Sequence, residues 1–382
     1  MNGRGAEIDV VIPLYNGKPW IAETVTSVQR QSLAPKRIIV VDDGSADGSP
    51  EMVERMQGVT FLRNCAKGPA SARGFGFARS TAPFIAFLDQ DDLWHPTHLE
   101  RLAALLAVSP SAPAAAAGLQ SFQDGSLPSF DLHDAGHCLF DPWDIYPTHD
   151  FAYTPGTLLV RREACAASNG WLKEHDGMSD YSFFMRLALN HPLLYSKAKT
   201  VAYRRHLYSA TCSLRKSASQ YLSLSLKVDD DLLKCCLARC PDAKKKETAQ
   251  RRNSLAHIMS CSIISLSNND RAGLRDSLKI LAAGLSCESD AFRKSLLYYL
   301  LYMQSNFSPS GDAMVPYYSL LLEAWPGTDR RTRSILQNII MEDRPGKSFY
   351  LSHLARKPWQ ATRLLFLLKA VLCRFPGFAV RR

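Results

Sequence analysis

The chain has 382 residues, of which 46% are hydrophobic and 21% are charged. This composition is typical of a globular protein and excludes a disordered or fibrous chain, and the length exceeds that of one usual domain. We therefore expect a domain of about 200 residues followed by a second region. The ten cysteines lack the CxxC pairs of zinc sites, which indicates reduced thiols.

The formal net charge of +10 lies almost entirely in the C-terminal tail. Residues 344–382 contain nine Lys and Arg residues and no Asp or Glu, so subtracting nine from ten leaves about one net charge for all preceding residues. Near the N-terminus the sequence reaches Pro13 after a short apolar run, which is neither a signal-peptide core nor a spanning helix. We expect a cytoplasmic protein.

Short apolar runs alternate with helical patterns in the first third of the chain. The apolar runs are residues 8–12, 37–41, 59–62 and 84–88, and the helical patterns are residues 20–32, 49–57, 71–80 and 96–108. Continuous apolar strands that alternate with helices are typical of a mostly parallel sheet covered on both faces, so the predicted fold class is α/β, doubly wound. Polar loops follow three of these strands, which predicts a site at the carboxyl edge of the sheet.

Periodicity is weak in residues 120–156, which are rich in Pro, Gly, Asp and aromatic residues and are predicted to form a long functional loop. Regular patterns return at residues 157–171, 179–190 and 200–206. From about residue 216 to residue 343 the pattern is helical, without a repeat that would indicate a solenoid. The predicted organisation is an α/β domain over 1–215, a helical region over 216–343 and a basic amphipathic tail over 344–382.

The stretch FIAFLDQDDLW places Asp89, Asp91 and Asp92 at the end of an apolar run. Carboxylates this close repel one another, so such a site usually supplies a cation, and oxygen ligands favour Mg²⁺ or Mn²⁺. The alternative is an acidic N-terminus of the helix that begins near Pro96, where the helix dipole favours anions. The three residues alone leave both interpretations open.

Four motifs occur in one order within about one hundred residues: VVIPLYNG, IIVVDDGSADGS, GPASARGFGFA and FIAFLDQDDLW. Together they closely resemble the inverting family 2 glycosyltransferases of bacterial type, which have the GT-A fold. The resemblance continues in TLLVRREACAASNGWL, SDYSFFMRLAL and YRRHLYSAT, so it covers about residues 7–213. It implies a GT-A catalytic domain over 1–215 that is Rossmann-like, with helices on both faces of its sheet.

The resemblance implies a nucleotide-sugar site built from the first strand loops. Pro13 and Tyr15 would line the nucleotide base, and Asp43 would accept a hydrogen bond from its ring N–H. Asp42 would act as a structural partner in that loop. The alternative for Asp42 and Asp43 is a turn closed by their own side chains, which the DDGS sequence favours.

Arg73 would lie near the ribose or diphosphate beside a helix N-terminus; its alternative is a surface charge.

Asp89-Gln90-Asp91 matches the DxD element of the family. Asp91 would then be a direct metal ligand, Asp89 would lie nearer the ribose, and Asp92 would support the loop. The implied cofactor is Mg²⁺ or Mn²⁺, which would neutralise the diphosphate leaving group. His206 corresponds to a residue that contacts the metal or diphosphate in some relatives, and Arg204 and Arg205 would help to neutralise phosphate. The alternative for His206 is a structural role.

Asp180 stands at the position of the catalytic base in the family, just before an apolar helical pattern. Such a base would activate an acceptor hydroxyl for a single displacement with inversion. Asp180 also suits the N-terminus of a helix in purely structural terms. Many relatives carry Glu before this Asp, whereas this chain has Ser179, so any role of that preceding carboxylate is absent here.

Residues 357–378 combine cations with a broad apolar surface and fit a helix that lies on an anionic membrane. The alternative is a terminal helix that packs on the helical region. Because the cations are interleaved with Leu, nucleic-acid binding is not expected. A membrane-bound tail would place the protein on the inner face of the plasma membrane.

These features predict a metal-dependent hexosyltransferase that moves one sugar from a nucleoside-diphosphate sugar, with UDP as the expected nucleotide. The partner would be a hydroxyl of a glycan or lipid-linked acceptor in cell-surface polysaccharide biosynthesis. No Trp follows an Arg as in the QxxRW motif of processive relatives, which favours one transfer per encounter. The alternative is a non-catalytic adaptor that binds nucleotide-sugar or glycan. A nucleotidyltransferase is disfavoured because no Gly-rich, Lys-containing phosphate loop occurs early in the chain.

Overall fold

A computed structural model describes residues 6–133, 136–141, 143, 154–206, 208–209, 217–240, 243–268 and 270–285. The basic tail predicted at 344–382, with its amphipathic segment 357–378, lies outside the described residues, as does the helical region after residue 285. The chain divides into two compact units: residues 1–216 with 220–254, and residues 217–219 with 255–382. The domain boundary at 215 stays a prediction.

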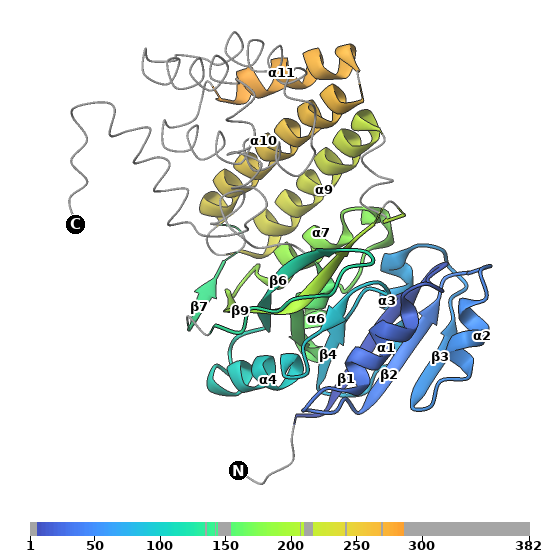
Figure 1. Cartoon of the computed structure of the whole chain (residues 1–382). Helices are drawn as coiled ribbons and strands as arrows, with labels where there is room; N and C mark the ends of the chain where they lie inside the picture. Colours follow the sequence, from blue (N-terminus) through green and yellow to red (C-terminus); the bar gives the residue numbers. More distant parts are fainter. Residues whose placement is uncertain are drawn as a thin grey trace, which may run out of the picture. The chain divides into compact units, whose positions relative to one another are not determined.

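The first unit is built on a nine-stranded mixed sheet (Figure 1). Its strand order is β3-β2-β1-β4-β8-β6-β9-β5, and β7 pairs with β9. The strands are β1 (Ile8–Leu14), β2 (Arg37–Asp42), β3 (Val59–Arg63), β4 (Phe84–Phe87), β5 (Leu93–Trp94), β6 (Ala114–Gln123), β7 (His137–Phe140), β8 (Leu158–Arg161) and β9 (Leu193–Arg205). Strands β1 to β4 pair with one another in parallel, as their mainly apolar runs predict.

Helices cover both faces of this sheet (Figure 1). Apolar residues of α1 (Ile21–Gln29), α2 (Ser49–Glu54) and α4 (His98–Val108) join one core cluster with β1 and β2. Residues of α3 (Pro69–Arg79), α6 (Arg162–Ala167) and α7 (Ser179–Leu187) join the other cluster. Two short 3₁₀ turns lie at Pro155–Thr157 and Lys173–His175. This arrangement confirms the predicted α/β fold class.

Three long helices follow the sheet: α9 (Ala218–Arg239), α10 (Ala243–Ser267) and α11 (Arg271–Leu285). Buried residues of α9, Val228 and Leu232 among them, join the core cluster beneath α7 and belong to the first unit. In the second unit, α11 approaches α10 closely at Gly284, beside the Leu255 side chain. Among the described helices, none combines the length and apolarity that crossing a membrane would require.

Two strands occur where the sequence did not predict them. The run of four alanines at residues 114–117 is fully buried in β6, between β8 and β9. Alanine favours helices locally, but the tight space between two neighbouring strands selects a small side chain here. Strand β7 lies within the segment that was expected to be a loop and pairs antiparallel with β9.

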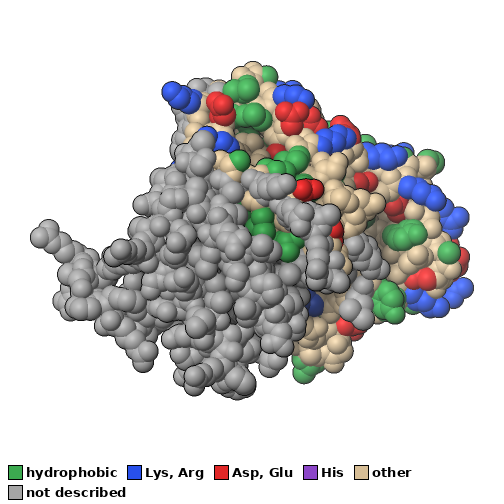
Figure 2. Space-filling view, turned by 90° about the horizontal axis from the view of Figure 1, so that it is seen from above, with side chains coloured by type: hydrophobic (Ala, Val, Ile, Leu, Met, Phe, Trp, Pro, Cys, Tyr) green, Lys and Arg blue, Asp and Glu red, His purple; other side chains and the backbone are tan. Residues whose placement is uncertain are grey.

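Charged side chains of both signs are interspersed on the face shown in Figure 2, wherever that face consists of described residues. This agrees with the nearly balanced charge of the chain before residue 344. The described part of this face therefore offers no broad basic surface of the kind that nucleic-acid binding requires.

The parallel strands bring their carboxyl ends to one edge of the sheet. Leu14 at the end of β1 pairs with Asp42 at the end of β2, and Val11 pairs with Phe87 at the end of β4. The loops at 15–20, 43–48 and 88–92 therefore emerge side by side. All three were predicted to carry site residues.

We expect Gly76→Ala to destabilise the sheet by about 1–3 kcal/mol, because overpacking forces neighbours to shift. A Cβ at Gly76 in α3 would lie 2.5 Å from Cγ1 of Val11 in β1. Chemical unfolding would measure the free energy of unfolding. The control is Gly74→Ala on the same helix, whose Cβ would meet nothing nearer than 3.9 Å; it should gain up to about 1 kcal/mol from helix propensity. Equal effects of the two substitutions would contradict the packing argument.

Candidate functional site

The acidic loop after β4 presents its carboxylates at different depths. The Asp92 side chain is buried, whereas Asp89 and Asp91 keep about a fifth of their side-chain surface exposed, 24% and 20%. Burial, and then the charges of Asp91 and Asp89, raise the pKa of Asp92 well above its usual range. Asp92 Oδ1 accepts a hydrogen bond from the backbone N–H of Arg204 at 2.9 Å. Asp92 therefore supports the loop from inside, as predicted, while the other two face the site.

Asp91 and His206, the two predicted metal ligands, lie together. His206 Nε2 is 2.9 Å from Asp91 Oδ2, although 115 residues separate them in the chain. The imidazole ring is held by Trp20 of the loop before α1, with ring centroids 4.1 Å apart. A carboxylate oxygen and an imidazole nitrogen that lie this close together are donor atoms that a divalent ion accepts, so the chemistry of the pair fits the predicted metal.

Within the part of the chain that the structure describes, no group of three His, Cys, Asp or Glu side chains is arranged for an ion. Asp91 and His206 would therefore supply two ligands, and the others would have to come from substrate oxygens and water. Such incomplete protein shells are usual for ions that bind phosphates.

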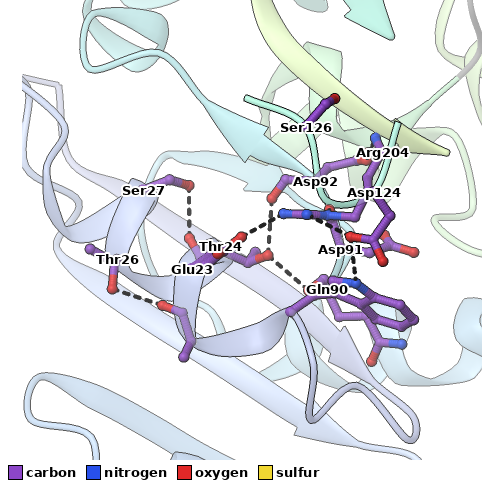
Figure 3. Close-up of polar contacts among 12 residues, drawn as sticks. Glu23, Thr24, Thr26, Ser27, Gln90, Asp91, Asp92, Asp124, Ser126 and Arg204 are labelled. Atoms are coloured by element: carbon purple, nitrogen blue, oxygen red, sulfur yellow. Dashed lines mark hydrogen bonds and ion pairs between the residues drawn. The ribbon is translucent and has the colours of Figure 1, made fainter. Parts of the chain in front are cut away.

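Arg204 fixes the acidic loop from behind (Figure 3). Its side chain is buried and donates to Glu23 Oε2 at 2.6 Å, to Asp124 Oδ1 at 2.9 Å and to the Asp91 carbonyl at 2.8 Å. These contacts join α1, the end of β6 and the acidic loop. The expectation that Arg204 neutralises phosphate is wrong for this arrangement, because its guanidinium is already occupied by these acceptors.

Thr24 of α1 adds a second attachment for the acidic loop. Its hydroxyl lies 2.8 Å from the Gln90 carbonyl and 3.0 Å from the Asp92 carbonyl (Figure 3). Because Thr24 is fully buried, these contacts are protected from competing water. The acidic loop is thus fixed to α1 through both its backbone and Arg204.

Gln90, the central residue of the DxD element, links this loop to the loop after β1. Its Oε1 accepts from the Tyr15 N–H at 2.7 Å, and its Nε2 donates to the Tyr15 carbonyl at 2.9 Å. Gly17 leaves room for it, since a Cβ there would lie 2.4 Å from Gln90 Oε1. The Tyr15 side chain remains 57% exposed beside the site, whereas Pro13 is buried within β1.

Arg73 joins the acidic loop to Asp180. Its Nη2 donates to Asp89 Oδ1 at 2.5 Å and its Nη1 donates to Asp180 Oδ1 at 3.1 Å. The guanidinium is buried against the ring of Trp171 at 4.7 Å. Burial alone would lower the pKa of Arg73, but the charges of Asp89 and Asp180 raise it, so the side chain stays cationic. The alternative of a surface charge is wrong.

Asp180 lies in the first turn of α7 and is partly accessible. Its side chain is 32% exposed, yet the surrounding protein removes most of its hydration. This desolvation raises the pKa of Asp180 to about 6, against the opposing charge of Arg73. A carboxylate with a pKa near 6 is mostly ionised at neutral pH and still accepts a proton, which suits a general base.

Asp43 and Asp42 stabilise the loop after β2. Asp43 accepts from Asn64 Nδ2 at 2.9 Å and from the Gly68 N–H at 2.7 Å, while Asp42 accepts from the N–H groups of Gly44 and Ser45. The turn predicted for Asp42 is confirmed. Asp43 is buried, and each of its carboxylate oxygens already accepts one hydrogen bond. A nucleotide base could therefore donate only to the remaining lone pairs of these oxygens.

Asp176 is a residue of the site that sequence reasoning missed. Its Oδ1 accepts from the Ala70 N–H at 2.9 Å, in the first turn of α3. With Asp43 on the Gly68 N–H, two carboxylates accept from backbone N–H groups at the start of α3. The Asp-Gly pair before Asp180 was the available signal, but only three-dimensional pairing identifies its partner.

The chain is similar to known proteins in sequence and in fold. Residues 9–168 match the sequence profile described as "Glycosyl transferase family 2". WfgD of Escherichia coli, named a UDP-Glc:alpha-D-GlcNAc-diphosphoundecaprenol beta-1,3-glucosyltransferase, is 32% identical over 102 residues, which are 26% of this chain and 40% of WfgD. The chain spans only 14% to 40% of the length of the curated relatives that it matches.

Two solved structures share the fold. TarS 1–349 of S. aureus in complex with UDP-GlcNAc has a TM-score of 0.57 at 15% identity, covering 88% of this chain and 92% of the other. The mannosyltransferase PcManGT of Pyrobaculum calidifontis in complex with GDP-Man and Mn²⁺ has a TM-score of 0.50 at 16% identity, covering 89% and 88%. At these identities the likeness concerns the fold alone.

We expect Arg204→Ala to lower the free energy of unfolding by about 2 kcal/mol, because it removes charge-assisted hydrogen bonds that join three segments. Thermal unfolding would measure the change. The control is Arg205→Ala at the next position, whose side chain is exposed and whose loss should change stability by at most about 0.5 kcal/mol. If the two variants unfolded alike, the structural role of Arg204 would be wrong.

Proposed function

We propose that this chain is a metal-dependent inverting hexosyltransferase of glycosyl transferase family 2, which the match of residues 9–168 to the family profile supports. It would move one sugar from a nucleoside-diphosphate sugar, with UDP as the nucleotide, to a hydroxyl of a glycan or lipid-linked acceptor. The observation that carries this proposal is the buried Arg73, which joins Asp89 of the acidic loop to Asp180. One guanidinium thus holds a donor-binding carboxylate and a base in a single site.

Asp180 is the proposed catalytic base. The oxygen of the acceptor hydroxyl attacks the anomeric carbon while the bond from that carbon to the diphosphate oxygen breaks. The hydroxyl proton passes to Asp180, and the nucleoside diphosphate leaves with the electron pair. A single displacement of this kind inverts the anomeric centre. The partial exposure of Asp180 gives an acceptor access to it, and Arg73 orients its carboxylate.

The donor would be held by the loops at the carboxyl edge of the sheet. Tyr15 is exposed and could cover a nucleotide base together with Pro13, and Asp43 is close in space because its N–H donates to the carbonyl of Leu14. Asp89 would contact the ribose, and Arg73, which is bonded to it, would face the sugar-phosphate region. TarS in complex with UDP-GlcNAc supports the choice of a UDP-sugar.

Asp91 and His206 would hold a divalent ion, Mg²⁺ or Mn²⁺. The mixed oxygen and nitrogen donor pair favours Mn²⁺, since imidazole suits first-row transition metals better than Mg²⁺. When bound, the ion supplies Lewis-acid neutralisation of the diphosphate leaving group. The Mn²⁺ complex of PcManGT, which has the same fold, supports this assignment.

The names of the relatives support the proposed acceptor and cellular location. The name of WfgD includes a diphosphoundecaprenol-linked sugar, which supports a lipid-linked acceptor and a role in cell-surface polysaccharide biosynthesis. An enzyme with such an acceptor would work at the cytoplasmic face of the plasma membrane. Residues 357–378 are the proposed membrane contact, and they lie outside the described residues.

A panel of nucleotide-sugars with Mn²⁺ tests the activity directly. We expect one UDP-sugar to raise the melting temperature and to release UDP, fastest with acceptor present. A protein that is stabilised by a donor but never turns it over with any acceptor would be an adaptor. Such a result would reject the enzymatic proposal.

We predict that Asp180→Asn lowers kcat about 10²- to 10⁴-fold, because the amide cannot accept the proton. Binding of UDP should persist, since Asp180 is not proposed to touch the nucleotide. Initial rates and calorimetric UDP titration would measure both. Transfer at the unaltered rate in Asp180→Asn would show that another group is the base.

Removal of divalent ions with a chelator should abolish transfer, and added Mn²⁺ should restore it. Asp91→Asn and His206→Ala should each raise the Mn²⁺ concentration for half-maximal rate at least about tenfold, because each removes one ligand. The control is Glu54→Gln, which changes an exposed carboxylate of α2 that is paired with Arg63 of β3. A chelator-resistant rate would contradict the metal assignment.

A further inference from the structure

The helix that carries Asp180 is held by residues that come long after the matched family segment. Helix α7 is almost wholly buried, and helix α9 with the first part of α10 belongs to the same compact unit, which extends to Ser254. The match between this chain and the family's sequence profile ends at residue 168. The residues that hold α7 from α9 and α10 are therefore a property of this chain that the profile does not describe.

The first contact is a buried carboxylate, Asp229 of α9, beside the residue that follows Asp180. Tyr181 donates its hydroxyl to Asp229 Oδ1 at 3.3 Å. Gln250 Nε2 donates to the same oxygen at 2.5 Å, and Ser254 Oγ donates to Oδ2 at 2.8 Å. Asp229 is only 4% exposed. Three elements, α7, α9 and α10, thus meet at one carboxylate.

The second contact lies one residue further along α7. Ser182 Oγ accepts from Arg186 Nε at 3.2 Å and lies 2.7 Å from His175 Nδ1. The other ring nitrogen, His175 Nε2, lies 3.1 Å from Asp231 Oδ2. This Asp–His–Ser series resembles a nucleophile triad, but Ser182 is fully buried and no substrate could reach it. The series therefore connects α7 to α9 a second time, from Ser182 through His175 to Asp231.

The third contact is at the other end of α7. The buried Lys246 of α10 donates to the carbonyls of Ala188 at 2.9 Å and Leu189 at 2.5 Å. A cation at this position satisfies carbonyls that a helix leaves without partners and complements its dipole. Helix α7 is therefore held at its first turn, along its length and at its end.

We propose that residues 220–254 form a brace for α7, and that Tyr181 and Asp229 are positioning residues that hold Asp180 in place for catalysis. The inference rests on the proposed function, because it concerns the base of that reaction. A buried carboxylate is a weak source of stability compared with apolar packing, but it defines one orientation. Orientation is what a base needs, since a misplacement of about 1 Å costs about 10²-fold in rate.

Tyr181→Phe and Asp229→Asn test the brace in the full-length chain. We expect each to lower kcat about tenfold while the KM for the nucleotide-sugar stays within about twofold, because the contacts described above connect α7 to α9 and α10 rather than to the loops at 15–20, 43–48 and 88–92. A purely structural role would lower the melting temperature and leave kcat of the folded enzyme unchanged. Asp230→Asn is the matched control: it is the next residue on α9, exposed, and paired with Lys234.

Hydrogen exchange of the α7 backbone amides gives a readout that needs no activity. It should be about tenfold faster in Asp229→Asn than in wild type, and unchanged in Asp230→Asn. Tyr181→Phe removes only one hydroxyl. If Asp229→Asn fails to fold, Tyr181→Phe therefore still tests whether the brace positions Asp180. Unchanged kcat and exchange in Tyr181→Phe would overturn the brace. If the wild-type protein turned over no donor, the proposed function would be wrong. The hydrogen-exchange rates would still test the brace in that case.

Discussion

Repulsion between carboxylates at the carboxyl edge of the sheet is the constraint that shapes this molecule. Asp89, Asp91 and Asp92 leave β4 within four positions, and Asp180 approaches them from α7. Two buried arginines, rather than water, offset this repulsion. Arg73 lies between Asp89 and Asp180, and Arg204 secures the backbone of the acidic loop from below. The charges that remain exposed are then available to a cationic ligand.

Local sequence was enough to predict the part of the site that lies on the parallel strands. Apolar runs predicted β1, β2 and β4, and parallel strands must end at one edge, so the loops with Tyr15, Asp43 and Asp91 could be placed together. The family motifs added Asp180 and His206. The structure does bring Asp91 next to His206, and Arg73 next to Asp180. Their chemical roles rest on the proposal.

What the sequence could not predict depends on contacts between distant segments. Arg204 pairs with Glu23, 181 residues away, and no local pattern distinguishes it from the exposed Arg205 beside it. The alanine run of β6 has helical propensity that only its neighbours in the sheet override. The sequence did not predict the brace either, because Asp229 is one of three consecutive aspartates and no local pattern distinguishes it from the other two.

The two arginines differ in what they connect, and this difference has a mechanistic consequence. Arg204 joins parts of the scaffold, so it fixes the acidic loop whether or not a ligand is present. Arg73 joins two groups proposed to act in the reaction, and its partners carry negative charge that a bound metal and diphosphate would redistribute. The charge of Asp89 acts directly on Asp180 and raises its pKa, whereas the charge of Arg73 lowers it. In the proposed reaction, a metal and diphosphate bound beside Asp89 would therefore change the pKa of Asp180, so donor binding and the protonation of the proposed base would be electrostatically coupled.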